Sequence, residues 1–417
     1  MYINRAIEDT VLNISKFFRV LLVTGPRQVG KTTLLQRLAG DKRQYVTLDD
    51  PDVRYLAQND PALFLQRYRP PILIDEIQYA PQILPYIKME VDRSNEPGEF
   101  WLTGSQMFHT MKNVSESLAG RVGIVRLLGL SNSEIQGVAS EPFTTDGDRL
   151  MQRIQTVPRM GLADVYERIF SGGMPELYGE NAPAPEPFYS SYVNTYLQRD
   201  IRDLTQVADE MAFYNFMTVL AARTAKPVVY EEIAKECGIS APTAKKWMSI
   251  LVSAQIVALA QPFYHNMLKR IVKIPVLYFL DTGLCAQLLK WDNAATLEKG
   301  PMSGAFFENW VFSEIYKSYL NKGLDPPVFY YRDKDKREID LLLFENGTLY
   351  PIEIKKSASP GKGAVKHFHV LNPVTAPEQR DGFSQYKLEI GAGAVVCMSN
   401  DVLPIDEKNR YVPAWLI

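Results

Sequence analysis

The sequence contains little cysteine and little histidine. Its three cysteines, Cys237, Cys285 and Cys397, are widely spaced and odd in number, which predicts neither a disulfide framework nor a cysteine-based metal site. The four histidines, among them His367 and His369, do not have the spacing of a metal-ligand set either. Free cysteines of this kind are typical of proteins that work in a reducing cytoplasm.

The chain also lacks long apolar runs and a strong net charge. No apolar run reaches the roughly 18 residues of a membrane-spanning helix, and the first residues carry no signal-peptide core. The net charge of -2 over 417 residues means that any binding to nucleic acid must come from a local basic face. Hydrophobic content of 46% and charged content of 23% are typical of globular proteins, and the length predicts about two to four domains.

A phosphate-binding motif lies near the N-terminus. An apolar run that begins at Val20 predicts a buried parallel strand, and the sequence GPRQVGKTT follows it directly. It fits the P-loop pattern G-x-x-x-x-G-K-[ST], whose backbone N–H groups surround a phosphate chain at a helix N-terminus. Lys31 would reach the β/γ-phosphates, and Thr32 would offer its hydroxyl to Mg²⁺. The predicted nucleotide-binding residues are Gly25, Pro26, Arg27, Gln28, Val29, Gly30, Lys31, Thr32 and Thr33.

An acidic pair follows a second apolar strand. The run that starts at Ile72 ends in Asp75 and Glu76. Alone, this pattern is more often a strand that leaves the core for solvent. Behind a P-loop it predicts a Walker B motif, in which Asp75 holds Mg²⁺ through its water shell and Glu76 polarises the water that attacks the γ-phosphate.

Two further features predict parts of an ATP site. A strand over 99–106 ends in small polar residues, and in the additional-strand class of P-loop ATPases such a strand lies between the P-loop and Walker B strands. Thr103 and Ser105 are both candidates to sense the γ-phosphate, with a plain strand-to-turn exit as the alternative. Arg121 precedes another predicted strand and is a candidate arginine finger, acting in cis or on a neighbour. An exposed or salt-bridged arginine is the alternative.

The segments GPRQVGKTT, LIDEIQ, LTGSQ and SLAGR occur in this order and resemble the bacterial and archaeal AAA+-type ATPases of the AAA_14 group. These usually carry a C-terminal region known as DUF4143, whose typical segments resemble residues 196–204, 279–284 and 306–309 here. The resemblance covers most of the chain. It implies an AAA+-type fold with accessory domains, and motors of this class usually work as rings, so a homo-oligomer, and specifically a hexamer, is a hypothesis.

Residues 230–251 follow a helix-turn-helix pattern. The first helix ends at Gly238, and Ser240 caps a second helix that begins with Pro242 in its first turn. Strands downstream predict a wing. The pattern predicts DNA contact, with the alternative that the module packs or docks onto protein, and it contains no base-reading set, which favours sequence-independent or structure-specific binding. The predicted DNA-binding residues are Lys245, Lys246, Trp247, Lys269, Arg270 and Lys273.

The C-terminal part resembles a PD-(D/E)xK nuclease core. A predicted amphipathic helix over 305–320 carries Glu308, and a later strand carries Glu353 and Lys355, which project to one face. Asp340, on the neighbouring strand, can lie beside them. The resemblance implies that Asp340, Glu353 and Glu308 hold a divalent metal and that Lys355 orients a water. A charged edge strand, or a core that has lost cleavage activity, is the alternative.

Together these features predict an α/β chain: a P-loop AAA+-type ATPase at 1–135, a helical lid or connector at 136–207, a winged helix at 208–290 and a nuclease-like domain at 291–417. The predicted function is a cytoplasmic ATPase that couples Mg·ATP hydrolysis to binding or remodelling of DNA, with branched or structured DNA as the expected partner and no membrane partner. The alternatives are an ATP-regulated endonuclease and a nucleotide-switched signalling or scaffold ATPase.

Overall fold

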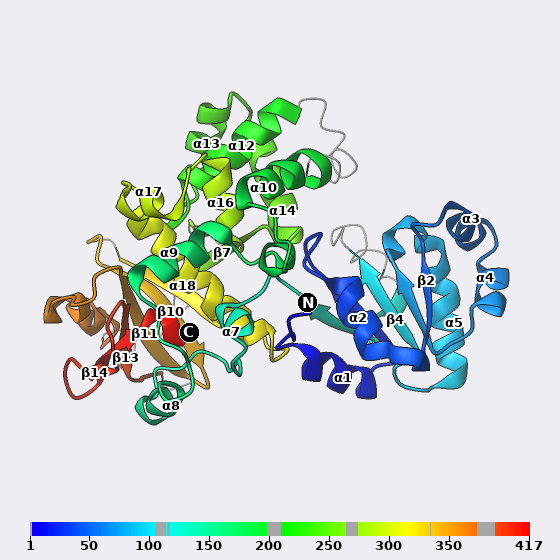
Figure 1. Ribbon diagram of the computed structural model, residues 1–417, viewed down its shortest axis with the longest axis horizontal. Coiled ribbons are helices and arrows are strands. Elements are labelled where there is room, and N and C mark those ends of the chain that lie inside the picture. Colours follow the sequence, from blue (N-terminus) through cyan, green and yellow to red (C-terminus); the bar gives the residue numbers. More distant parts are fainter. Residues whose placement is uncertain are drawn as a thin grey trace, which may run out of the picture.

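The molecule is seen in a computed structural model that describes residues 2–104, 114, 117–197, 210–263, 274–333, 335–372 and 388–417. The chain forms two lobes, with the N-terminus between them (Figure 1). The N-terminal lobe holds the first sheet, and the rest of the chain builds the second lobe. Within these ranges, no helix has both the length and the apolar character needed to cross a bilayer.

The N-terminal lobe is built on a five-stranded parallel sheet with the order β2-β3-β4-β1-β5. Strand β4 lies between β3 and β1, which confirms the predicted position of an additional strand between the Walker B and P-loop strands. Because all five strands run the same way, their carboxyl ends meet at one edge of the sheet. The strands are β1 (Val20–Thr24), β2 (Gln44–Thr47), β3 (Ile72–Asp75), β4 (Phe100–Gly104) and β5 (Val122–Arg126).

Helices cover both faces of this sheet, and alternate strand residues feed two cores. Leu21 and Val23 pack with residues of α1 and α2, whereas Val20 and Leu22 pack with residues of α3, α4 and α5. This two-sided burial explains the apolar character of β1. The helices are α1 (Glu8–Phe17), α2 (Lys31–Ala39), α3 (Pro51–Asn59), α4 (Pro61–Arg67) and α5 (Leu84–Ser94), with 3-10 turns at Gly40–Lys42, Ile77–Tyr79 and Pro81–Ile83.

The second lobe begins with helices and a helix-turn-helix. Its first helical elements are α7 (Asn132–Gln136), α8 (Gly147–Arg153), α9 (Leu162–Ser171), Pro175–Tyr178, α10 (Pro185–Tyr192) and Val193–Leu197. The helix-turn-helix region follows as α12 (Glu210–Ala222), β6 (Lys226–Pro227), α13 (Tyr230–Cys237), α14 (Ala241–Ser253), β7 (Val257–Pro262) and β8 (Val276–Phe279). As predicted, Gly238 ends α13 in a left-handed conformation and Ser240 caps α14.

The C-terminal part adds three helices and seven strands to the described ranges. These are α16 (Thr282–Leu288), α17 (Ala294–Lys299), α18 (Ser303–Leu320), β9 (Val328–Arg332), β10 (Glu338–Glu345), β11 (Thr348–Lys355), β12 (Glu389–Ile390), β13 (Gly393–Cys397), β14 (Leu403–Pro404) and β15 (Asn409–Pro413). Short 3-10 turns lie at Lys362–Val365, Phe368–Leu371 and Ala414–Leu416.

The helix-turn-helix region and the C-terminal part share one large sheet. Its order is β14-β15-β13-β11-β10-β9-β7-β8-β6, with β12 beside β11. The junction is a parallel pairing of β7 with β9, in which Gln261 lies opposite Phe329. The strands on either side of the predicted boundary at 290/291 are therefore hydrogen-bonded into one structure.

Helix α18 lies inside the second lobe. The expectation of an amphipathic helix is wrong, because apolar and polar side chains alike are buried, including Trp310, Glu314 and Lys317. A helix buried on all sides needs internal partners for its polar groups. Asn309 illustrates this: its amide oxygen accepts from the Phe279 N–H at 2.7 Å, and its amide nitrogen donates to the Phe279 carbonyl at 2.7 Å.

Candidate active site

The P-loop connects the carboxyl end of β1 to the start of α2. Gly30 precedes α2 with a φ of 89°, and Gly25 has a φ of 154°. A Cβ at Gly25 would lie 2.0 Å from the carbonyl oxygen of Leu127, so only glycine fits this close approach of two backbones. The loop therefore has the tight, glycine-dependent turn that the sequence predicted.

Lys31 is folded over this loop. Its Nζ donates to the carbonyl oxygens of Gly25 at 3.0 Å and Pro26 at 2.8 Å, and the residue is 6% exposed. A buried ammonium needs acceptors or an anion, since its charge is expensive to remove from water. The lysine is thus held inside the turn whose amides are predicted to bind phosphate.

The Asp75 carboxylate accepts hydrogen bonds from three side-chain hydroxyls, which lie on α2, β4 and β2. The Thr32 hydroxyl donates to its Oδ1 at 2.8 Å, the Thr103 hydroxyl donates to the same oxygen, and the Tyr45 hydroxyl donates to Oδ2 at 3.1 Å. Burial and the neighbouring Asp75 charge raise the pKa of Tyr45 to about 12, so it stays a protonated donor at neutral pH. The predicted Mg²⁺ ligands Thr32 and Asp75 are brought together.

Glu76 lies directly after this carboxylate in a left-handed conformation, with a φ of 59°. Its backbone N–H donates to the Thr103 hydroxyl at 3.0 Å, and its carboxylate accepts from the Gln78 side-chain amide. Thr103 thus links the two Walker B acids, which places this predicted sensor residue within the site. The other sensor candidate, Ser105, lies outside the described residues.

Arg121 lies at the opposite edge of the sheet. Strands β1 and β5 are in parallel register from Val20 beside Val122 to Thr24 beside Arg126, so Arg121 precedes the amino end of β5 while the P-loop follows the carboxyl end of β1. In the same chain, Arg121 donates to Asp92 at 2.9 Å, and this contact holds the pKa of Asp92 below its usual range. This geometry opposes a role in cis; a role in trans stays a prediction.

A cleft of about 400 Å³ adjoins the P-loop on the side of the second lobe. Its lining includes Tyr2, Arg5, Gly30, Thr33, Pro175 and Asn181. Sequence analysis missed Tyr45, Arg5 and the second-lobe residues of this cleft. For Tyr45 a signal existed, since it lies in an expected strand of the same parallel sheet. Arg5 and the second-lobe residues lie beside the P-loop only because of the tertiary fold, and no local motif identifies them.

The helix-turn-helix is formed, but one predicted DNA contact is wrong. Trp247 is 6% exposed, and its ring lies 5.1 Å from that of Phe213 and 5.5 Å from that of Phe216, both on α12. It therefore packs α14 against α12. Lys245 and Lys246 are exposed on α14. The remaining predicted contacts, Lys269, Arg270 and Lys273, lie outside the described residues.

The predicted nuclease-like residues form a charged cluster where α18 meets β10 and β11. Lys355 Nζ contacts Glu353 Oε1 at 2.7 Å and Asp340 Oδ2 at 3.5 Å, and the Ile354 N–H donates to Asp340 Oδ2 at 2.8 Å. Glu308 Oε1 accepts from the Tyr278 hydroxyl at 2.7 Å. The single lysine ammonium thus pairs with both strand carboxylates but balances only one of their two negative charges.

The electrostatics of this cluster favour the neutral forms of Glu308 and Glu353. Burial, then the Asp340 charge, raises the pKa of Glu308 to about 8 and that of Glu353 to about 7. Burial lowers the pKa of Lys355, but Asp340 and Glu353 outweigh it and the net shift is upward. In the described part of the chain, no three His, Cys, Asp or Glu side chains are arranged to hold a metal ion. The geometry gives no support to the metal role predicted here.

Three family profiles match successive parts of the chain. An AAA domain (AAA_14) matches residues 17–136, a domain of unknown function (DUF8612) matches 162–295, and another (DUF4143) matches 303–417. The first contains the P-loop, Walker B and additional strands. The second contains the helix-turn-helix, and the third contains α18 and the charged cluster.

Several known proteins are similar to this chain. The uncharacterized proteins Rv2008c of Mycobacterium tuberculosis and Mb2031c of Mycobacterium bovis are each 31% identical over 345 residues, which are 82% of this chain and 71% of theirs. Among solved structures, the Walker-type ATPase PABY2304 of Pyrococcus abyssi aligns with 69% of this chain and 96% of its own, at 13% identity and a TM-score of 0.43.

Proposed function

We propose that this chain, which belongs to the family of AAA-type P-loop ATPases with a C-terminal DUF4143 region, hydrolyses Mg·ATP and uses it to rearrange bound DNA. The observation that carries the hydrolytic part is the hydroxyl-bonded Asp75, which joins Thr32 to Thr103 beside the loop that contains Lys31. This arrangement joins three separate motifs at one sheet edge, as phosphoryl transfer requires.

The residues present fit a magnesium–nucleotide complex. Gly25 lets the loop close around a phosphate chain, and the Lys31 ammonium, which contacts the Gly25 and Pro26 carbonyls, would turn toward added anionic oxygens. Thr32 and Asp75 would hold Mg²⁺, which supplies charge neutralisation on the phosphate oxygens when bound. Glu76 would orient and polarise the attacking water, and the adjoining 400 Å³ cleft would take the nucleoside.

Replacing Glu76 tests this assignment. Glu76→Gln keeps the size of the side chain and its hydrogen-bonding capacity but removes the basic carboxylate. We expect nucleotide binding within about threefold of wild type and turnover reduced by at least about 100-fold. A steady-state phosphate-release assay beside a binding titration separates the two quantities. Normal turnover by Glu76→Gln would show that another group polarises the water.

Arg121 is proposed to act on the phosphates of a neighbouring copy, because it lies at the edge of the sheet that is remote from its own P-loop. A homo-oligomer, such as a hexameric ring, would bring Arg121 to the phosphates of the neighbouring copy. Subunit mixing tests this directly: Lys31→Ala and Arg121→Ala should each be inactive alone, whereas their mixture should contain sites with an intact P-loop and an intact neighbouring arginine. Recovered ATPase activity supports the trans role, and no recovery at any ratio refutes it.

DNA binding is proposed for the exposed face of α14, where Lys245 and Lys246 stand side by side. Fluorescence anisotropy with single-stranded, duplex and four-way-junction DNA tests it at about 50 and 200 mM salt. Replacing both lysines with alanine should lower the salt slope by roughly 1 to 2. The matched control replaces Lys16 and Lys42, two exposed lysines of the N-terminal lobe. Absence of binding to all three DNAs at low salt would favour the scaffold alternative.

Metal-dependent DNA cleavage is the second candidate. The clustering of Asp340, Glu353 and Lys355 favours it, while the pairing of both acids with the lysine ammonium weighs against it. Incubation of labelled junction DNA with the protein and Mg²⁺ or Mn²⁺ tests for this cleavage. Cleavage lost in Asp340→Asn would establish this activity, and intact DNA under conditions that support ATP turnover would remove it.

A further inference from the structure

A buried arginine connects the N-terminal segment to the P-loop. Arg5 is 6% exposed, and its guanidinium donates both to backbone carbonyls and to a carboxylate. Nη1 donates to the carbonyl of Val29 in the P-loop at 2.7 Å, Nη2 donates to the carbonyl of Leu128 at 2.7 Å, and Nε donates to Glu134 Oε1 at 2.9 Å. The side chains of Arg5 and Glu134 are only 4% and 2% exposed, so this is an internal ion pair.

The contact to Val29 determines the direction of the next amide. In a planar trans peptide the C=O and the following N–H point in opposite directions. Because Arg5 holds the Val29 carbonyl on its own side, the Gly30 N–H faces away from Arg5. Gly30 is the last residue before α2, where amides are free to bind an anion. A bond of this kind to a charged donor is stronger and more directional than a neutral one.

Glu134 holds Arg5 in place from the other side. Its Oε1 also accepts from the Ala6 N–H at 2.7 Å, and its Oε2 accepts from the Ser131 N–H at 2.7 Å. The latter contact is half of a capping box that starts α7. The carboxylate therefore joins the N-terminal segment, including the Arg5 guanidinium, to α7 in one joint.

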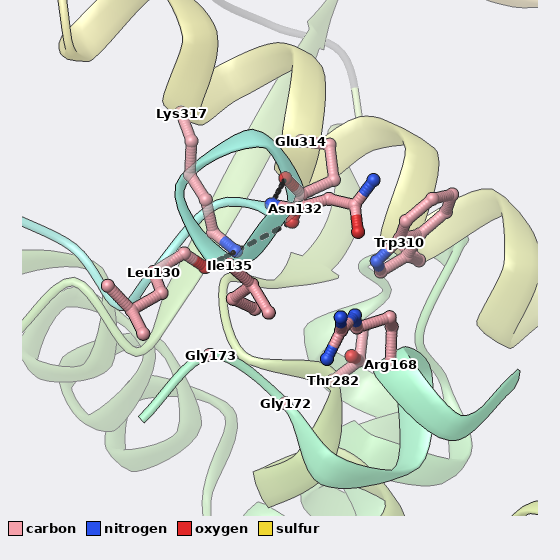
Figure 2. A pocket seen from close by; sticks show the side chains of 10 residues that line it. All are labelled: Leu130, Asn132, Ile135, Arg168, Gly172, Gly173, Thr282, Trp310, Glu314 and Lys317. Carbon is pink, nitrogen blue, oxygen red and sulfur yellow. Dashed lines mark hydrogen bonds and ion pairs between the residues drawn. The ribbon is translucent and has the colours of Figure 1, made fainter. Parts of the chain in front are cut away.

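The same joint reaches α18 in the second lobe. The backbone N–H of Asn132, at the start of α7, donates to Glu314 Oε2 at 2.7 Å, and Lys317 Nζ donates to the Leu130 carbonyl at 3.0 Å. Lys317 also pairs with Glu314 Oε1 at 2.8 Å. Figure 2 shows both α18 side chains reaching the turn that contains Leu130 and Asn132. Arg5 pairs with Glu134 and Lys317 pairs with Glu314, so this series of contacts carries no net charge.

We propose that Arg5 is a positioning residue of the nucleotide site, which fixes the Val29–Gly30 peptide with its N–H toward the phosphates. Through Glu134, the position of α18 affects the orientation of this amide. By reciprocity, a bound nucleotide affects the position of α18. The inference rests on the proposed nucleotide binding by the P-loop, and it adds how the second lobe communicates with that site.

Nucleotide titrations of Arg5 variants test the first part. Wild type is titrated first with ADP and ATP by calorimetry, and Arg5→Lys and Arg5→Ala follow at a temperature well below each variant's melting temperature. Loss of the charged contact should weaken binding by about 10- to 100-fold in Arg5→Ala. Arg5→Lys retains a donor and should recover part of the affinity. A purely structural arginine would lower the melting temperature and leave the Kd of the folded protein unchanged.

The link to α18 is tested with a charge-neutral pair of substitutions. Replacing Glu314 and Lys317 together with methionine keeps the helix buried without an unpaired charge. It removes the acceptor for the Asn132 N–H, so nucleotide affinity should fall by about threefold or more. Tyr319→Phe is the matched control, because its hydroxyl ties α18 to the Phe143 carbonyl at 3.1 Å without touching this joint. Its Kd should equal that of wild type.

The outcomes are distinguishable. If wild type binds nucleotide and both Arg5 variants bind it equally well, the positioning role is overturned and the proposed function stands. If the Glu314/Lys317 double variant binds like Tyr319→Phe, the link to α18 is overturned. If wild type itself binds neither ADP nor ATP, the proposed function fails, and this inference fails with it.

Discussion

Gly25→Ala is the sharpest local test of the P-loop geometry. The added Cβ would lie 2.0 Å from the Leu127 carbonyl oxygen, whereas Cβ contacts under 3.0 Å are essentially never found. The loop or the segment after β5 must therefore move by roughly 1 Å, and neither is a flexible side chain. The φ of 154° at this position adds backbone strain of about 1 to 3 kcal/mol in a residue that is not glycine.

This movement acts on the nucleotide site because the Gly25 carbonyl accepts from Lys31 Nζ at 3.0 Å. The variant loop can relax in the free protein, but it must return to the strained conformation when nucleotide binds. The strain of about 1 to 3 kcal/mol then appears as a loss of about 5- to 150-fold in nucleotide affinity. Calorimetry or nucleotide fluorescence at a temperature where the variant is folded measures this loss.

Gly238→Ala is the matched control. Gly238 has a φ of 67° but nothing within 4 Å of its Cβ position, so alanine there carries backbone strain without a clash. It should cost about 1 to 2 kcal/mol of stability and leave nucleotide affinity unchanged. Wild-type affinity in Gly25→Ala would refute the claim that this close approach shapes the phosphate loop.

Three further predictions concern the other parts of the chain. Trp247→Ala should lower the free energy of unfolding by about 3 to 5 kcal/mol in denaturant titrations, whereas Lys245→Ala should change it by less than about 0.5; equal effects would contradict the packing role of the tryptophan. Because folding raises the carboxyl pKa values of Glu308 and Glu353, their contribution to stability is present below about pH 4.5 and is lost as the pH rises to about 8. Glu353→Gln should therefore flatten the fall in melting temperature over that range, and an unchanged profile would refute the buried environment. Asp92→Asn should leave the ATP affinity of the chain unchanged, since Asp92 pairs with Arg121 at the edge remote from the chain's own P-loop; a large loss of affinity would show that this edge contributes to the nucleotide site.

Features fixed by local sequence were predictable. The P-loop, the acidic end of β3 and the helix-turn-helix each depend on residues within one turn or strand end, so spacing alone identifies them. The position of β4 between β3 and β1 followed from the resemblance to a known class of ATPase. Parallel strands then bring Thr32, Asp75 and Thr103 to a common edge.

Features that depend on distant partners were missed or misread. The burial of Trp247 had a signal, because Ala244, Met248 and Leu251 form one apolar stripe with it at helical spacing. Arg5 had none, since its ion-pair partner lies 129 residues away. Helix α18 carries charged residues whose backbone partners lie 182 and 187 residues earlier in the chain, and its sequence therefore resembled a surface helix.

The Mg·ATP affinity of the whole chain, measured by calorimetry beside that of Lys31→Ala, tests the central claim most directly. The account predicts saturable binding by wild type and at least about 100-fold weaker binding by the variant, because the variant loses a buried positive charge inside the loop. Undetectable binding by wild type, or equal binding by both proteins, would contradict the assignment of this loop as a nucleotide site.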